Sequence, residues 1–112
     1  MRTKIEYKND ILFIKIIGFL VGDKIDKFEM QIIPIILILE ARKVVINMAD
    51  VVLIDRRGVE SIIKISNIVN GFKGKTVLCN LNEYLKINFK HSDIYDYCYK
   101  TKNEKNIKWV FN

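Results

Sequence analysis

The chain has 112 residues, of which 19 are basic and 13 acidic, so its net charge is +6. Half of the residues are hydrophobic and only six are Gly or Pro, which excludes a disordered, collagen-like or low-complexity chain. The length fits a single domain over residues 1–112 with one core. The longest charge-free run, Met30–Leu39, is too short to span a membrane, which takes about 20 apolar residues. The N-terminus lacks the apolar segment of a secretory signal, and we expect a cytoplasmic protein.

The positive charge allows an acidic partner, a nucleic acid or an anionic lipid. The lysines are scattered along the chain, however, and no run of five basic residues occurs. No basic helix or aromatic-rich strand of a nucleic-acid-binding module is visible. The sequence therefore favours a solvated lysine-rich surface, and no nucleic-acid partner is expected.

The N-terminal residues predict a β-hairpin. Thr3–Lys8 alternates apolar and polar residues as a strand does, and Ile11–Ile17 is a second strand. The pair Asn9-Asp10 forms the turn between them, so the strands should be antiparallel. Gly18 is expected to end the second strand.

A long helix should follow, from Lys24 to about Glu40, with Asp23 as its N-cap. Its apolar residues recur at helical spacing: Ile25, Phe28, Ile32, Ile36 (or Ile35) and Leu39. Pro34 should kink or shorten this helix. In a rival interpretation the helix ends near Ile33 and Ile35–Leu39 is a strand; the sequence favours the helix because Arg42-Lys43 leads into a better strand.

That better strand is Lys43–Met48, whose run of β-branched residues predicts burial on both faces, with helices above and below. Ala49-Asp50 should turn the chain, and Val51–Ile54 is a short apolar stretch. A second helix covers about Arg57–Asn70 and stops at Asn70-Gly71. Its expected inner stripe is Val59, Ile62, Ile63, Ser66 and Val69.

The last third predicts a strand at Lys75–Asn80 and a short helix at Glu83–Phe89, capped by Asn82. Ile94–Tyr99 should be a final strand or extended segment, and Ile107–Phe111 a final turn or strand. Strands that alternate with helices indicate an α/β fold. We expect a mixed sheet of four to five strands flanked by helices.

Residues for catalysis or metal binding are sparse. The single histidine, His91, and the cysteines Cys79 and Cys98 give no ligand cluster at usual spacing, so no metal site and no cofactor are expected. Two thiols do not form a disulfide framework, and a cysteine in a buried strand behaves as a small hydrophobe. The chain also lacks a glycine-rich phosphate loop and an evident acid–base pair, so an enzyme is not expected.

One segment, Asp55-Arg56-Arg57-Gly58, stands out on physical grounds because it opens the second helix. Asp55 can cap the free amides there, whereas Arg56 and Arg57 are cations at the positive end of the helix dipole. Such an unfavourable placement marks a candidate functional site, an anion-attracting patch for a carboxylate, a phosphate or an acidic partner. The alternative is that both arginines simply extend into water.

A second candidate surface lies on the first helix, where Met30, Ile33 and Leu37 fall away from the core stripe. They make an apolar strip that could bind a partner or form a homodimer face. The alternative is a shorter helix in which these residues face the core.

The order of segments resembles the STAS domain, the fold of bacterial anti-sigma factor antagonists. The resemblance rests on Gly18-Phe19-Leu20 after a strand, Val44–Met48, Val52–Asp55 with Gly58 opening a helix, and Gly74–Leu78. It covers nearly the whole chain and agrees with the α/β fold deduced above. It implies a non-enzymatic protein that binds a serine-kinase-like anti-sigma factor and regulates transcription by partner switching.

The resemblance also implies a switch loop at Asp55–Gly58, the partner-binding segment. Family members have Asp-Ser-Ser-Gly there and are phosphorylated on the second serine. This chain has Arg57 at that position and Arg56 before it, and arginine cannot take that phosphate. Ser61, one turn into the helix, is the nearest hydroxyl and the remaining candidate for modification.

Two other functions stay open. Some STAS proteins are accessory subunits of membrane transporters and bind the transporter's ATPase. The basic surface of this chain and the absence of the phosphorylated serine are compatible with that role. The third possibility is a small anionic ligand, a nucleotide or a lipid, held at Arg56 and Arg57.

Overall fold

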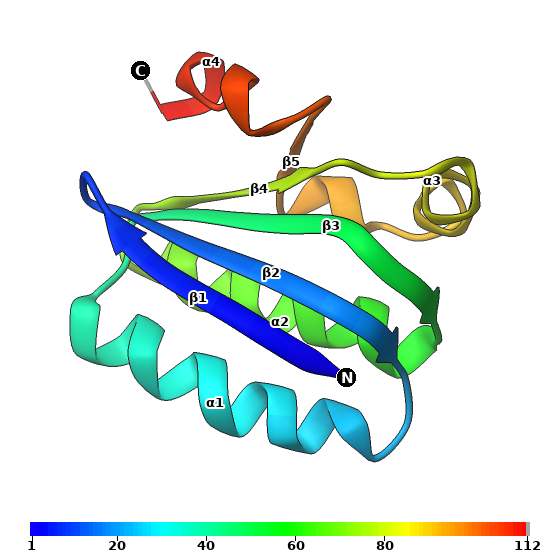
Figure 1. Ribbon diagram of the computed structural model, residues 1–112. Coiled ribbons are helices and arrows are strands. Elements are labelled where there is room, and N and C mark those ends of the chain that lie inside the picture. The colour runs from blue at the N-terminus through cyan, green and yellow to red at the C-terminus, as the bar shows by residue number, and fades with distance from the viewer. Residues whose placement is uncertain (112) are drawn as a thin grey trace.

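The computed structural model describes residues 1–111 and shows a five-stranded mixed sheet in the order β1-β2-β3-β4-β5. Helices α1 and α2 lie side by side on one face of the sheet, and the C-terminal α4 lies over the other (Figure 1). The expected α/β architecture is therefore confirmed. No helix within residues 1–111 is long and apolar enough to cross a membrane.

The hairpin forms as predicted, from β1 (Arg2–Lys8) and the antiparallel β2 (Ile11–Leu20). Asn9 and Asp10 both take positive φ, which suits the tight turn. The expected end of the strand at Gly18 is wrong, since β2 continues to Leu20. Gly18 has φ +104°, and its lack of a side chain lets the strand pass through this conformation without breaking.

Helix α1 (Lys24–Leu39) runs through Pro34, so the rival interpretation with a strand at Ile35–Leu39 is wrong. The buried residues are Ile25, Phe28, Ile32 and Ile36, as the spacing predicts. Asp23 is helical and makes no side-chain cap bond. Backbone carbonyls of Val21 and Gly22 accept from the first amides instead, so Asp23 holds the predicted N-cap position but does not cap the helix with its side chain.

Strand β3 (Lys43–Ile54) is one continuous strand, and the predicted turn at Ala49-Asp50 is wrong. The register against β2 shifts at two places, each leaving an extra residue on β3. Such bulges let polar residues stand on the strand without ending it, and Asp50 pairs there with Lys15 at 3.2 Å.

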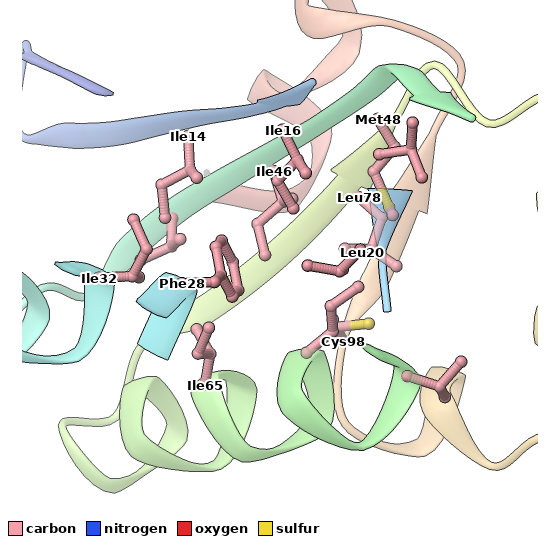
Figure 2. Close-up of a cluster of buried hydrophobic side chains, with 14 of the residues drawn as sticks. Ile14, Ile16, Leu20, Phe28, Ile32, Ile46, Met48, Ile65, Leu78 and Cys98 are labelled. Carbon is pink, nitrogen blue, oxygen red and sulfur yellow. The ribbon is translucent and has the colours of Figure 1, made fainter. Parts of the chain in front are cut away.

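The core of the sheet is buried on both sides, as the β-branched run predicted. Val44 and Ile46 face α1 and α2 in the main cluster, which Figure 2 shows around Phe28, Ile46 and Ile65. Val45 packs on the other face in a smaller cluster with Ile107. The second cover is thus the C-terminal segment rather than a long helix.

Helix α2 (Arg56–Gly71) begins one residue earlier than predicted, and β4 (Lys75–Cys79) and α3 (Glu83–Lys90) follow. Within the inner stripe of α2, Ile65 is fully buried and Ile63 only partly, so the sequence misplaced this position.

The C-terminal third departs most from the prediction. Ile94–Tyr99 is not a strand: η1 (Ile94–Asp96) is a 3₁₀ turn, started by a hydrogen bond from the Ile94 amide to the Ser92 hydroxyl. The last strand is the short β5 (Tyr99–Thr101). A second 3₁₀ turn, η2 (Glu104–Asn106), leads to α4 (Lys108–Phe111), which replaces the predicted final turn or strand.

Candidate functional site

The start of α2 is built around Asp55, as predicted. Its Oδ1 accepts from the Gly58 amide and its Oδ2 from the Gly22 amide, both at 2.9 Å. The carboxylate therefore caps α2 and also holds the loop that precedes α1. Burial raises the pKa of Asp55, but the two amides and the nearby Arg57 outweigh burial and hold that pKa below its ordinary value.

Gly58 allows the first turn of α2 to lie against the end of β2. A Cβ at this position would lie 2.4 Å from the Leu20 carbonyl oxygen and 2.6 Å from Ile54 Cγ1. Neither contact is possible in a real protein, so the close approach requires glycine. The segment Asp55–Gly58 is therefore fixed in place at both of its ends.

The two arginines point to different partners. The side chain of Arg56 is 93% exposed and pairs with Glu60 one turn along α2, at 3.0 Å. The side chain of Arg57 is 49% exposed and reaches α1, where it lies 3.2 Å from Asp26 and 3.9 Å from Asp23. Carboxylates thus offset the unfavourable dipole position of both cations, a compensation that the local sequence did not reveal.

Ser61 does not present its hydroxyl to solvent. The residue is 2% exposed, and its Oγ has no hydrogen-bond partner within residues 1–111. A kinase cannot reach this oxygen in the folded protein. Ser61 therefore belongs to the packing between α2 and the rest of the domain rather than to the exposed part of the site.

The sequence missed a set of exposed apolar side chains on the elements around this segment. Large apolar side chains are exposed at the C-terminal ends of β2 and β3 and on α3: Phe19, Val52, Leu53, Tyr84 and Ile87. Phe19 and Leu53 are neighbours across the strands, and the Tyr84 hydroxyl bonds to the Ile54 carbonyl at 3.0 Å. We call these five residues the strand-end patch. Its signal in the sequence was the unexplained apolar run Val51–Ile54, of which Val52 and Leu53 are exposed.

The second candidate surface is placed partly as predicted. Met30 is 77% exposed and Leu37 50%, so both lie on the outer side of α1. Ile33 is half-buried and packs against the core, so its predicted outward position is wrong. The outer apolar strip instead continues through Pro34 and Ile38, both exposed.

The remaining reactive groups are buried or isolated. Burial raises the pKa of both Cys79 and Cys98 to about 12, so neither is a thiolate at neutral pH. Within residues 1–111 no three His, Cys, Asp or Glu side chains gather as a metal site would need.

Taken together, a five-stranded mixed sheet with α1 and α2 on one face and a helix start capped by Asp55 after β3 defines an α/β domain. The family model of the STAS domain matches residues 2–107, and the chain belongs to this family.

Solved structures of similar fold include anti-sigma factor antagonists. Unphosphorylated SpoIIAA is 16% identical, with a TM-score of 0.76, and 97% of each chain is covered. A putative anti-sigma factor antagonist of Thermotoga maritima is 14% identical, with a TM-score of 0.84, covering 96% of this chain and 92% of its own. These likenesses show the fold.

A transporter also contains this fold. The murine anion transporter Slc26a9 matches with a TM-score of 0.77 and 11% identity, over 90% of this chain but 17% of the transporter chain. A search among curated protein sequences gives no match.

Proposed function

We propose that this protein is a non-enzymatic regulator that binds a partner protein through the start of α2 and the strand-end patch. The observation that carries the proposal is the exposed Arg56 at the start of α2, just after the end of β3, where Val52 and Leu53 are also exposed. Exposed apolar surface next to a cation is typical of protein interfaces, in which arginine and aromatic residues are enriched. In the family this end of the domain is the switch segment.

The partner we propose is a serine-kinase-like anti-sigma factor, because the similar structures include anti-sigma factor antagonists. In this chain Arg57 stands where the family has its phosphorylated serine, and Ser61 is buried. We therefore propose that binding is not switched by phosphorylation at either position. A positive segment also favours an acidic surface on the partner.

A second candidate is a subunit of a membrane transporter. The match to the STAS segment of Slc26a9 supports it, as does the basic surface of this chain. A small anion at Arg56 and Arg57 is a weaker candidate, since Glu60, Asp26 and Asp23 already face both guanidinium groups.

Affinity capture of the tagged protein from its own cells separates these functions. The proposal expects an ATP-binding, serine-kinase-like protein among the captured partners. A transporter ATPase in its place would move the function to the second candidate. Capture of neither class, combined with a thermal shift on addition of nucleotides, would favour the small anion.

A further inference from the structure

The excess positive charge of the chain is concentrated at the hairpin end of the sheet, away from the start of α2. A hollow of about 620 Å³ lies there between the hairpin, β3 and the C-terminal segment. Six lysines line it: Lys4, Lys8, Lys15, Lys43, Lys105 and Lys108. Its acidic residues are Glu6 and Glu104.

A second hollow of about 430 Å³ adjoins the first, since Lys43 and Phe111 line both. It adds Arg42, Lys73 and Lys75 against one acid, Asp10. We call the two hollows together the basic groove.

The basic groove accounts for the whole net charge of the protein. It holds nine of the 19 basic residues and three of the 13 acidic ones, an excess of six, and the chain carries +6. The rest of the chain, with ten basic and ten acidic residues, is neutral. Eight of the lysines that look scattered along the sequence thus lie together around these two hollows.

The sheet places several of these charges unfavourably. Lys4 lies directly opposite Lys15 across β1 and β2, and Lys43 lies opposite Lys75 across β3 and β4. Like charges at directly opposite positions destabilise a sheet. Only Lys15 of these four forms a salt bridge within residues 1–111, with Asp50. An anion in the groove would relieve this repulsion.

The floor of the larger hollow is apolar. Ile11, Phe13 and Phe111 are partly buried there and pack on the small cluster that contains Ile107. A site with an apolar floor and a cationic rim is complementary to a molecule with an apolar tail and an anionic head. These floor side chains are half-buried and packed on the small cluster, which suits an apolar tail lying across them better than bases stacked on exposed rings.

We propose that the basic groove binds a small amphiphilic anion, with its tail on Ile11, Phe13 and Phe111 and its carboxylate or phosphate head among the lysines. The volume of the larger hollow lies within the range of about 300–1,000 Å³ usual for small-molecule sites. The site lies on the opposite face of the sheet from α1 and α2 and is independent of the proposed partner surface.

Isothermal titration of the whole chain tests the proposal with four probes: decanoate, decyl phosphate, decanol and inorganic phosphate, each as dissolved monomer. We expect saturable binding of decanoate and decyl phosphate, and much weaker binding of decanol and of inorganic phosphate. Inorganic phosphate that binds as well as decyl phosphate would overturn the role of the tail. Binding only to vesicles with anionic lipid, and not to the monomeric probes, would overturn the small-molecule site.

Variants locate the binding. Lys8 and Lys108 are exposed, so the double variant Lys8→Gln with Lys108→Gln should fold and should bind decanoate about fivefold more weakly. The double variant Lys27→Gln with Lys90→Gln makes the same charge change at exposed positions outside the groove and should bind as the wild type does. Phe111→Ala should weaken decanoate binding through the tail. Equal losses in the two lysine pairs would overturn the assignment.

Discussion

Arg57 Nη2 donates to Oδ1 of Asp26 at 3.2 Å and so joins the first turn of α2 to the first turn of α1. The contact explains how a cation can sit at the positive end of a helix dipole, because a carboxylate from another helix compensates it. It also leaves Arg56, whose side chain is 93% exposed, as the arginine most available to a partner.

The close contact of Gly58 with Leu20 predicts that Gly58→Ala strongly destabilises the domain. The new Cβ would lie 2.4 Å from the Leu20 carbonyl oxygen, and relieving this overlap should cost about 1–3 kcal/mol of unfolding free energy. Urea denaturation measures the change. Gly71→Ala is the matched control on the same helix, because a Cβ there meets nothing within 4 Å. Equal stability of the two variants would contradict the contact.

The cap at Asp55 predicts a stability loss that depends on pH. Asp55→Ala removes the acceptor of the Gly58 and Gly22 amides and should cost about 1–2 kcal/mol at neutral pH. The folded-state pKa of Asp55 is lowered, so its contribution is present above the ordinary pKa of about 3.9 and is lost as the pH falls through the folded value. Denaturation curves of wild type and variant should therefore converge in acid.

Asp23→Ala is the control for that experiment, because Asp23 stands at the start of α1 without a side-chain cap bond. Its effect should be within about 0.5 kcal/mol, as for most exposed positions. A loss as large as that of Asp55→Ala would show that the assignment of the two caps is wrong.

The structure confirms the elements that a periodic residue pattern predicted. It corrects the segments whose conformation depends on contacts with residues far away in the sequence. Helical spacing located α1, and the β-branched run at Val44–Ile46 located the buried strand. The bulges that carry β3 past Ala49-Asp50 depend on pairing with β2, which local composition does not reveal. The same holds for Ile94–Tyr99, where a turn fixed by the Ser92 hydroxyl replaces an apparent strand.

For the candidate site, too, local features were predicted from the sequence and contacts between distant segments were not. Asp55 as a cap is a local feature that the segment itself shows, whereas the close approach of Gly58 to Leu20 of β2 was not predicted and depends on the tertiary fold. The carboxylate partner of Arg57 comes from another helix, 31 residues earlier in the chain. The strand-end patch required the tertiary fold, because Leu53 and Tyr84 come from different elements.

The register of α1 predicts opposite results at neighbouring apolar positions. Ile36 is fully buried, so Ile36→Ala should cost about 2–4 kcal/mol of unfolding free energy. Ile38 is exposed, so Ile38→Ala should change stability by less than about 0.5 kcal/mol. Thermal or urea unfolding distinguishes the two. A large loss at Ile38 would mean that the outer strip is covered in the protein itself.

The buried thiols predict slow chemical modification. Burial raises the pKa of Cys79 and Cys98 to about 12, and both side chains are shielded from solvent. A thiol-specific reagent at neutral pH should therefore react with neither thiol on the timescale of seconds, but with both after unfolding in urea. Rapid reaction of one thiol in the folded protein would place that cysteine at an accessible site.

The start of α2 is the surface that we propose binds a regulatory protein. The most direct test is affinity capture with wild type, Arg56→Glu and Lys73→Glu. Lys73→Glu reverses the same charge at an exposed position beyond the other end of α2, so it controls for net charge. We expect a serine-kinase-like protein to be captured by wild type and Lys73→Glu and to be lost with Arg56→Glu. Equal capture by all three proteins would contradict it.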